Sequence, residues 1–238
     1  MQAYERMSDK VVPSCEHLAM HGIKQSGEYE IDPDGELYGE DAIKVYCNFT
    51  TNTTEIRHNS ESQVVLEKCS ERGCFEHKIQ FLSNSTFAQM KALADISESC
   101  SQEFTFDCFL TPLMYNNVSF GFWLDRYGIE QNFFAGEDYG NHTCQCGIEG
   151  NCVDEDVACN CDSKTPTWLK DSGLITEKEL LPITAFKYGP IKYDIEEAKV
   201  QVGKLKCSGL RDPSFGYLHP QMAGGYSGSS QVCPIVHL

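Results

Sequence analysis

The alternation of apolar and polar residues predicts a chain built mainly from short strands. β-branched and aromatic residues recur with a period of two in seven segments, which is typical of strands with one buried face. These segments are residues 28–31, 42–49, 64–66, 104–109, 118–124, 183–188 and 198–205.

Helical periodicity is limited to two places. Residues 86–97 carry apolar side chains at helical spacing, and Ser85 or Thr86 is a suitable N-cap. A second helical turn is predicted from Thr176, where T-x-x-E resembles a capping box and Pro182 ends the turn. Many strands with one or two short helices indicate an α+β or mostly β domain.

Composition narrows the class of protein. The 238 residues are 41% hydrophobic and 11% aromatic, enough for a real core in one large domain with at most a small appendage. A net charge of −16 repels phosphate backbones, so we expect no nucleic-acid partner. No apolar run is long enough to span a bilayer, so no transmembrane segment is expected.

Cysteines and glycosylation sequons change this picture most. Thirteen cysteines accompany five N-x-[ST] sequons, a combination typical of secreted or cell-surface glycoproteins with disulfides. The predicted disulfide cysteines are Cys15, Cys47, Cys100, Cys108, Cys144, Cys146, Cys152, Cys159, Cys161 and Cys207. The predicted N-glycosylation sites are Asn48, Asn52, Asn84, Asn117 and Asn141.

The densest cysteine cluster runs from Cys144 to Cys161 with the spacing C-x-C-x5-C-x6-C-x-C. Structural zinc sites usually present C-x2-4-C pairs, often followed by paired histidines, and neither pattern occurs here. Neighbouring cysteines in C-x-C rarely bond each other, so we expect each to reach another segment. Disulfides are favoured, and a zinc site is the alternative.

No motif predicts catalysis, and we assign no catalytic or metal-binding residue. G-x-S-x-G, H-E-x-x-H and phosphate-binding glycine loops are absent from the sequence. Asp32 and Asp34 fit the first two ligand positions of an EF-hand, but Gly35 follows too early, so residues 32–35 are predicted to form a β-turn. Three histidines are expected at the surface or in turns: His58, His142 and His219. An aromatic cluster is expected in the core: Phe120, Phe122, Trp123, Tyr127, Phe133 and Phe134.

The N-terminal part resembles a known domain. Residues 15–47 contain a cysteine, then S-G-x-Y-x-I-D-P-D-G, then V-Y-C-N, and this order resembles the opening of fibrinogen C-terminal domains. The resemblance implies a disulfide between Cys15 and Cys47. Strands 29–31 and 43–46 are expected to pair around the turn at residues 32–35.

From the centre onward the chain resembles the contactin-associated proteins, the neurexin-four group of adhesion receptors. The matching positions are residues 54–59, Cys100 and Cys108, 121–123, the block 144–162, Trp168, 170–171, 181–182, 206–207 and 217–219. In that group a short fibrinogen-like domain lies between laminin-G domains. Fibrillar collagen C-propeptides are more distant relatives, and they suggest a bridge from Cys108 to Cys207. The GGW and W-x-x-Y-x-x-G-F-G motifs of full fibrinogen domains are missing, which weakens the expectation of their ligand pocket and calcium loop.

These observations predict a truncated fibrinogen-like α+β domain with five or six disulfides over residues 11–207. Residues 1–10 form an N-terminal segment, and the Gly/Ser/Pro-rich residues 208–238 resemble the start of a laminin-G segment. We expect a non-enzymatic extracellular module for adhesion or matrix assembly that binds proteins or matrix components. The alternatives are a secreted acidic matrix protein, as in a mineralised matrix, and a lectin-like domain. No cofactor is expected beyond weak, diffuse Ca²⁺ binding.

Three features predict that the chain is part of a larger protein. It has no signal peptide, its cysteine count is odd, and residues 217–219 resemble a laminin-G segment. Cys233, in the Gly/Ser-rich tail, is the candidate for a free thiol or an intermolecular disulfide.

Overall fold

The structure, a computed structural model, describes residues 11–35 and 39–211. These residues form three α-helices, one 3-10 turn and fourteen strands. The helical elements are α1 (Cys15–Met20), α2 (Phe87–Ile96), α3 (Gln145–Glu149) and η1 (Asn160–Ser163). The strands are β1 (Gly27–Ile31), β2 (Ile43–Asn48), β3 (Thr53–Ile56), β4 (Val64–Val65), β5 (Phe75–Lys78), β6 (Ser99–Phe109), β7 (Met114–Tyr115), β8 (Val118–Ser119), β9 (Gly121–Leu124), β10 (Glu130–Gln131), β11 (Leu169–Ile175), β12 (Ala185–Tyr188), β13 (Glu197–Val202) and β14 (Leu205–Ser208). The expected disulfide-stapled α+β class with mostly antiparallel strands is confirmed.

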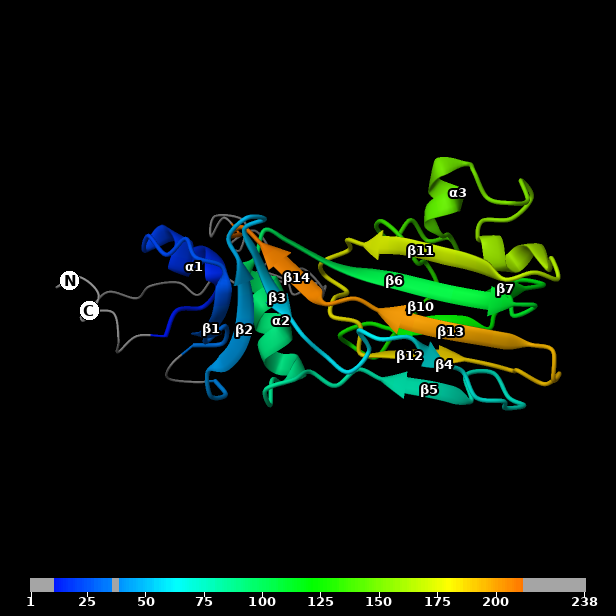
Figure 1. Cartoon of the computed structure of the whole chain (residues 1–238), viewed down its shortest axis with the longest axis horizontal. Helices are drawn as coiled ribbons and strands as arrows, with labels where there is room; N and C mark the ends of the chain where they lie inside the picture. The colour runs from blue at the N-terminus through cyan, green and yellow to red at the C-terminus, as the bar shows by residue number, and fades with distance from the viewer. Residues whose placement is uncertain (1–10, 36–38, 212–238) are drawn as a thin grey trace, which may run out of the picture.

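The long strand β6 joins the two lobes of the molecule (Figure 1). An eight-stranded sheet runs β1-β2-β3-β14-β6-β13-β4, and β11 also pairs with β6. The start of β6 pairs with β14 in the N-terminal lobe, while the rest pairs with β11 and β13 in the second lobe. β13 and β14 follow each other along β6, interrupted at Gly203. There the N–H of Gly203 donates to the carbonyl of Glu103 at 2.7 Å.

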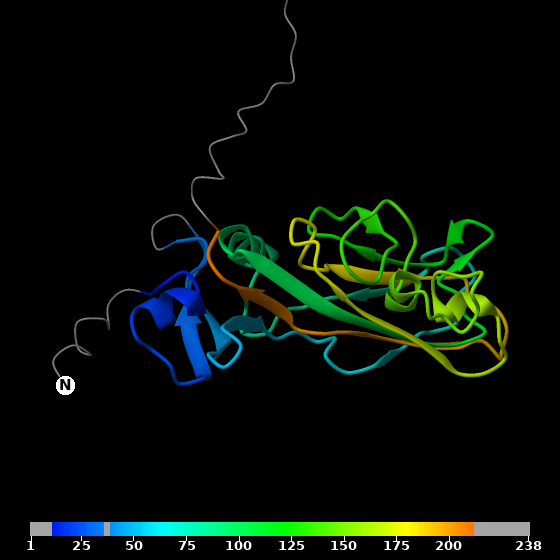
Figure 2. The ribbon, with the colours of Figure 1, turned by 90° about the horizontal axis from the view of Figure 1, so that it is seen from above.

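The second lobe is a sandwich with an aromatic core. A four-stranded sheet, β10-β9-β12-β5, lies against the β6 sheet, and Figure 2 shows the two layers from above. The β6 side chains Phe104 and Phe106 point inward, and the ring of Phe106 lies 5.8 Å from Phe186 and 5.5 Å from Tyr188 on β12. Each of these rings is fully buried, so apolar burial holds the two layers together.

The N-terminal lobe follows the sequence pattern closely. Strands β1 and β2 pair as expected, with Tyr29 opposite Val45. Gly35 has a φ of 94° and donates its N–H to Asp32 Oδ1 at 2.9 Å, which confirms the predicted turn. Helix α2 begins after Thr86, which forms a capping box with Gln89. Its buried face consists of Gln89, Met90, Leu93 and Ala94.

An ion pair between buried Arg126 and partly exposed Asp95 connects α2 to the sandwich. The side chain of Arg126, 2% exposed, donates from Nη1 to Asp95 Oδ1 at 2.7 Å and also bonds the carbonyl of Lys178. Burial alone would raise the pKa of Asp95, but hydrogen bonds from Lys91 and Arg126 hold it below its usual value. The contacts of Arg126 with Asp95 and Lys178 help to fix the angle between the lobes, because these groups come from α2, the β9–β10 turn and the segment before β12.

Several sequence predictions are wrong in detail. The helical turn expected from Thr176 is a hydrogen-bonded turn instead, because Leu181 enters the core and the chain runs on to β12. The strand expected at 118–124 is divided into β8 and β9. Of the expected core aromatics, Tyr127 is 60% exposed because it lies in the turn between β9 and β10. Phe120, directly before β9, is only half-buried. His58 is buried, with Nε2 against the carbonyl of Gly203 at 2.8 Å, rather than at the surface.

Candidate functional site

Six disulfides organise the described residues. All ten predicted cysteines are paired, and the pair Cys15–Cys47 implied by the fibrinogen resemblance is present. Cys69 and Cys74, which the sequence analysis left unassigned, form a further bridge. The remaining pairs are Cys100–Cys207, Cys108–Cys161, Cys144–Cys159 and Cys146–Cys152.

The suggested bridge from Cys108 to Cys207 is wrong, and strand register explains why. Cys207 on β14 lies directly opposite Cys100 at the start of β6, with their Cα atoms 4.1 Å apart. Cys108 lies near the far end of β6, roughly 26 Å along an extended strand from Cys100. There it bonds Cys161, so β6 carries one bridge into each lobe.

Residues 144–161, here called the cysteine-rich block, depend on these bridges for their shape. As expected, neither C-x-C pair closes on itself; Cys144 bonds Cys159, and Cys161 reaches β6. The four cysteines of the two C-x-C pairs are buried, while the block's large apolar side chains Ile148 and Val153 are 48% and 60% exposed. The block therefore offers protruding surface on a covalent frame rather than on a core of its own.

Asp171 on β11 attaches the block to the sheet. Its carboxylate, 1% exposed, accepts the backbone N–H groups of Asn160 and Cys161 at 2.8 Å each. Burial raises its pKa to about 6, against the lowering effect of these two hydrogen bonds. The side chain of Asn160 also donates to the carbonyl of Lys170 at 3.0 Å, so η1 is held along β11.

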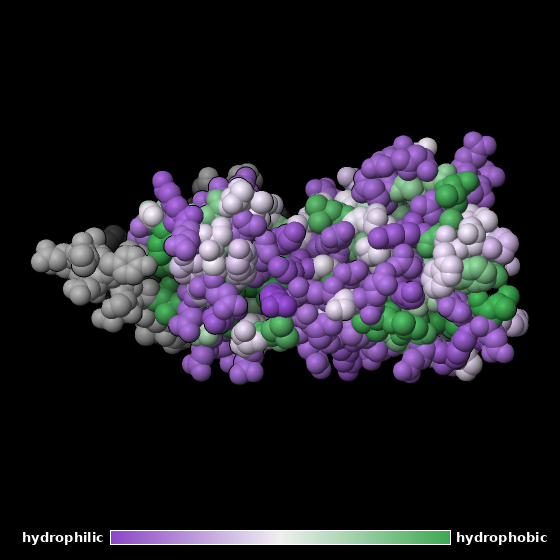
Figure 3. Space-filling model, viewed as in Figure 1, coloured by the Kyte–Doolittle hydropathy of each residue, from purple (hydrophilic) through white to green (hydrophobic). Residues whose placement is uncertain are grey.

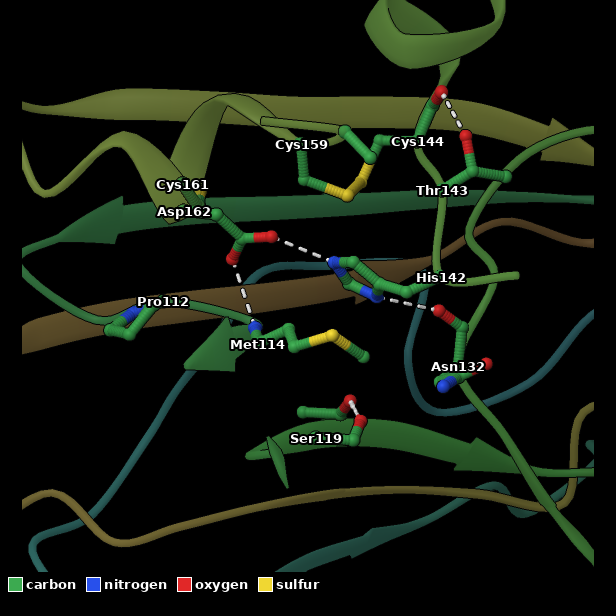
Figure 4. A network of polar contacts seen from close by, with 12 residues as sticks. Pro112, Met114, Ser119, Asn132, His142, Thr143, Cys144, Cys159, Cys161 and Asp162 are labelled. Atoms are coloured by element: carbon green, nitrogen blue, oxygen red, sulfur yellow. Dashed lines mark hydrogen bonds and ion pairs between the residues drawn. A yellow bond between two sulfur atoms is a disulfide. The ribbon is translucent and has the colours of Figure 1, made fainter. Parts of the chain in front are cut away.

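His142 and Asp162 form a second polar link to the block (Figure 4). His142 Nε2 lies 2.7 Å from Asp162 Oδ2, and Nδ1 lies 2.9 Å from the carbonyl of Asn132. Asp162 Oδ1 accepts the N–H of Met114 at 2.9 Å. His142 was expected at the surface or in a turn; it lies in the loop before α3, but its side chain is only 8% exposed and not at the surface. His219 lies outside the described residues.

No role in the site is predicted from the sequence for Asp171, His142 or Asp162. Asp171 interrupts the inward-facing positions of β11, and a lone acid among them was the available signal. The His142–Asp162 contact left no such signal, because it depends on how the disulfides fold the intervening residues.

Two groups in the described part of the chain have the composition of a metal site. They are His142 with Cys159 and Asp162, and Cys144 with Cys159 and Asp171. Cys144 and Cys159 are bonded to each other, and a disulfide sulfur is not the thiolate that zinc requires. Disulfide formation and zinc binding thus exclude each other at these positions.

The sequon asparagines lie in turns or at strand ends. Asn52, Asn84 and Asn117 adopt positive φ and are exposed, and Asn141 is exposed as well. Asn48 is half-buried, with Nδ2 donating to Glu55 Oε1 at 3.2 Å. Glycosylation of the five sequons stays a prediction.

Cys233 and the tail lie outside the described residues, as do residues 1–10. Within the described ranges, no helix is long and apolar enough to cross a membrane.

Comparison with known proteins agrees with this architecture. Contactin-associated protein 1 of rat and of human is 32% identical over 203 residues, which is 84% of this chain and 14% of the relative. Neurexin-4 of Drosophila melanogaster is 32% identical over 198 residues, 79% of this chain and 15% of the relative. The chain is homologous to one region of these proteins. The resemblance to the contactin-associated proteins that the sequence indicates is confirmed.

The fibrillar collagen relationship is also found. The family described as "Fibrillar collagen C-terminal domain" matches residues 5–118. This range includes the elements from α1 to β7, with the whole of β6, but ends before the cysteine-rich block. The homology to contactin-associated protein 1 covers far more of this chain, although the chain spans only about 14% of that relative's length.

Proposed function

We propose that this chain is an extracellular, non-enzymatic protein-interaction module that acts in cell adhesion or matrix assembly. The observation that carries the proposal is the 32% identity to contactin-associated protein 1 and neurexin-4 over most of the chain. Six disulfides support a secreted or surface location, because such bridges form and persist in oxidising compartments. The exposed sequons support a glycoprotein.

Binding, rather than catalysis, is the activity that the described surface supports. His142 and Asp171 are used to hold backbone and side-chain groups in place. We propose no resident cofactor.

The first partner to test is contactin, since the name of one relative states an association with it. The glycosylated, oxidised chain should bind an immobilised contactin ectodomain or extracellular-matrix proteins in biolayer interferometry. Beads coated with the chain should also adhere to cells. Beads that adhere to neither cells nor matrix would contradict the adhesion proposal. A reduced and alkylated sample is the matched control, because it retains the sequence but loses the six disulfides.

The acidic-matrix alternative rests on the net charge of −16, which attracts Ca²⁺ diffusely. Calorimetric titration with Ca²⁺ distinguishes the acidic-matrix alternative from the adhesion proposal. Many weak Ca²⁺ sites would favour a secreted acidic matrix protein, and one tight site would indicate a coordination cage. If the chain binds no Ca²⁺, the adhesion proposal is the one that remains. Glycan-array binding would favour the lectin-like alternative.

Cys233 is proposed to form an intermolecular disulfide or to remain a free thiol. The six bridges use twelve of the thirteen cysteines and leave Cys233 over. On non-reducing electrophoresis, the parent chain should form dimers that the Cys233→Ser variant lacks. If both run as monomers, the cross-linking proposal is wrong.

A further inference from the structure

A notch lies between the terminal strands of the two sheets. In the described part of the chain, β4 ends the first sheet and β5 ends the second, and each pairs along one edge only. A groove of about 440 Å³ separates them. It is lined by Val64, Val65, Glu67, Lys68, Phe75, Glu76, His77 and the Cys69–Cys74 bridge. We call this groove the β4–β5 notch. The Cys69–Cys74 bridge lies at the end of the notch where the chain crosses between the sheets.

The notch combines apolar walls with an exposed rim. Val64 and Phe75 are half-buried and pack against the core, whereas Val65 is 65% exposed. Figure 3 shows apolar surface near the position of β4, on a face that is mostly hydrophilic. A long side chain entering the notch would therefore find apolar contacts for its stem.

Polar groups in the notch have bonding capacity to spare. Among the described residues, Glu67 has no hydrogen bond or ion pair, and the buried Nε2 of His77 has no partner. Glu76 lies 3.9 Å from both Lys78 and Lys187, beyond the distance of a charge-assisted hydrogen bond. Two carboxylates at the rim thus remain able to accept hydrogen bonds from a cationic side chain.

The neighbouring loop is held by several hydrogen bonds and presents apolar side chains. Lys68 Nζ donates to the carbonyls of Tyr193 and Glu196, the latter at 2.6 Å. Glu196 Oε2 in turn accepts the backbone N–H of Lys192 at 2.7 Å. Tyr193 and Ile195 are nevertheless 69% and 62% exposed. A loop ordered in this way loses little conformational entropy on binding, so its exposed side chains favour contact with a protein.

The segments that form the notch and the loop contain no sequon. None lies between Asn52 and Asn84 or after Asn141, so the segments that form the notch and the loop carry no predicted glycan. A protein partner can therefore approach without displacing sugar attached to these segments.

We propose that the β4–β5 notch, with Tyr193 and Ile195 beside it, docks a short extended segment of a basic protein partner. An arginine or lysine side chain enters the notch, its stem against Val64 and Phe75 and its charged end between Glu67 and Glu76. A second copy of this chain is a poor occupant, because each copy carries a net charge of −16. The proposal rests on the interaction function proposed above and names the site and the chemistry of its partner.

A peptide titration tests the site directly. The probe is the acetylated, amidated tripeptide Val-Arg-Val, and the matched probe replaces arginine with citrulline, which has nearly the same shape but no charge. With methyl-labelled valines and labelled histidine, NMR should show saturable shifts at Val64, Val65 and His77 for the arginine peptide. We expect a Kd of about 1 mM and markedly weaker binding of the citrulline peptide.

Variants provide the control. The double change Glu67→Gln and Glu76→Gln should weaken binding of the arginine peptide about threefold to tenfold. Glu71→Gln, at an exposed glutamate outside the lining, should leave binding unchanged. No saturable shifts, shifts elsewhere, equal binding of both peptides, or no effect of the double variant would each overturn the proposal. If beads of the wild type adhere and those of the double variant adhere equally, the notch proposal fails while the adhesion function stands.

Discussion

The aromatic sandwich and the cysteine-rich block contact each other but are stabilised by different means. In the sandwich, Phe104, Phe106 and Phe186 are fully buried and packed ring against ring. In the block, the buried side chains are cysteines, and Ile148 and Val153 are exposed. Apolar burial favours the folded sandwich in any redox state, whereas the block requires its disulfides.

Strand β6 and its neighbour β11 connect the aromatic sandwich to the cysteine-rich block. Phe106 contributes a ring to the core and lies opposite Asp171, which holds η1 through two backbone N–H groups. Two residues further along β6, Cys108 bonds Cys161 of the block. The sheet is thus a rigid base from which covalent and polar links project a surface that could not fold alone.

The largest effect should come from the sandwich core. Phe106→Ala removes a fully buried ring and should lower the free energy of unfolding by about 3–5 kcal/mol. Phe87→Ala on α2, where the ring is 41% exposed, is the control and should cost about 1 kcal/mol or less. Denaturant unfolding followed by near-UV circular dichroism measures both. Equal losses would show that burial does not decide the stability of the sandwich.

The sequence predicted the regions where local rules apply. The β1–β2 hairpin followed from alternation and the turn at residues 32–35, and helix α2 followed from its spacing and the cap at Thr86. In both cases the decisive contacts join residues that lie near each other in the chain. The cysteine pairings were harder to predict from the sequence, since the Cys100–Cys207 bridge joins residues 107 positions apart and depends on strand order.

The polar attachment of the block was least predictable. Asp171 accepts hydrogen bonds from backbone groups of residues ten and eleven positions away in the chain. His142 contacts Asp162, which lies twenty residues further along the chain. Neither contact has a sequence motif, because the acceptors and donors lie on segments whose proximity depends on the disulfide-linked fold of the block. The predicted burial of Tyr127 was wrong for a related reason. This aromatic residue follows a buried strand closely in the sequence, but it belongs to an exposed turn.

A disulfide comparison sharpens the contrast between the regions. Replacing Cys144 and Cys159 with serine opens a loop of 15 residues and should cost about 3 kcal/mol, with loss of protection confined mainly to the block. Replacing Cys69 and Cys74 opens a loop of five and should cost about 2 kcal/mol. Hydrogen exchange, read by mass spectrometry, locates the change. Loss of protection across β12 in the Cys144/Cys159 variant would contradict independent stabilisation of the sandwich.

The smallest expected effect concerns pH and Asp171. Its folded pKa of about 6 lies above the ordinary 3.8, so this group favours the folded state at low pH. That contribution is complete below the unfolded pKa and is lost as pH rises through about 6. Asp171→Asn removes the titration, whereas the lowered histidine pKa values of His58 and His77 are common to both proteins and cancel. The unfolding free energy of the wild type should therefore fall relative to the variant by roughly 1 kcal/mol between about pH 5 and about pH 7. Paired urea titrations at the two pH values measure the difference. A constant difference would show that the two N–H donors balance burial at this carboxylate, and a difference that grows in favour of the wild type with pH would show that they outweigh it.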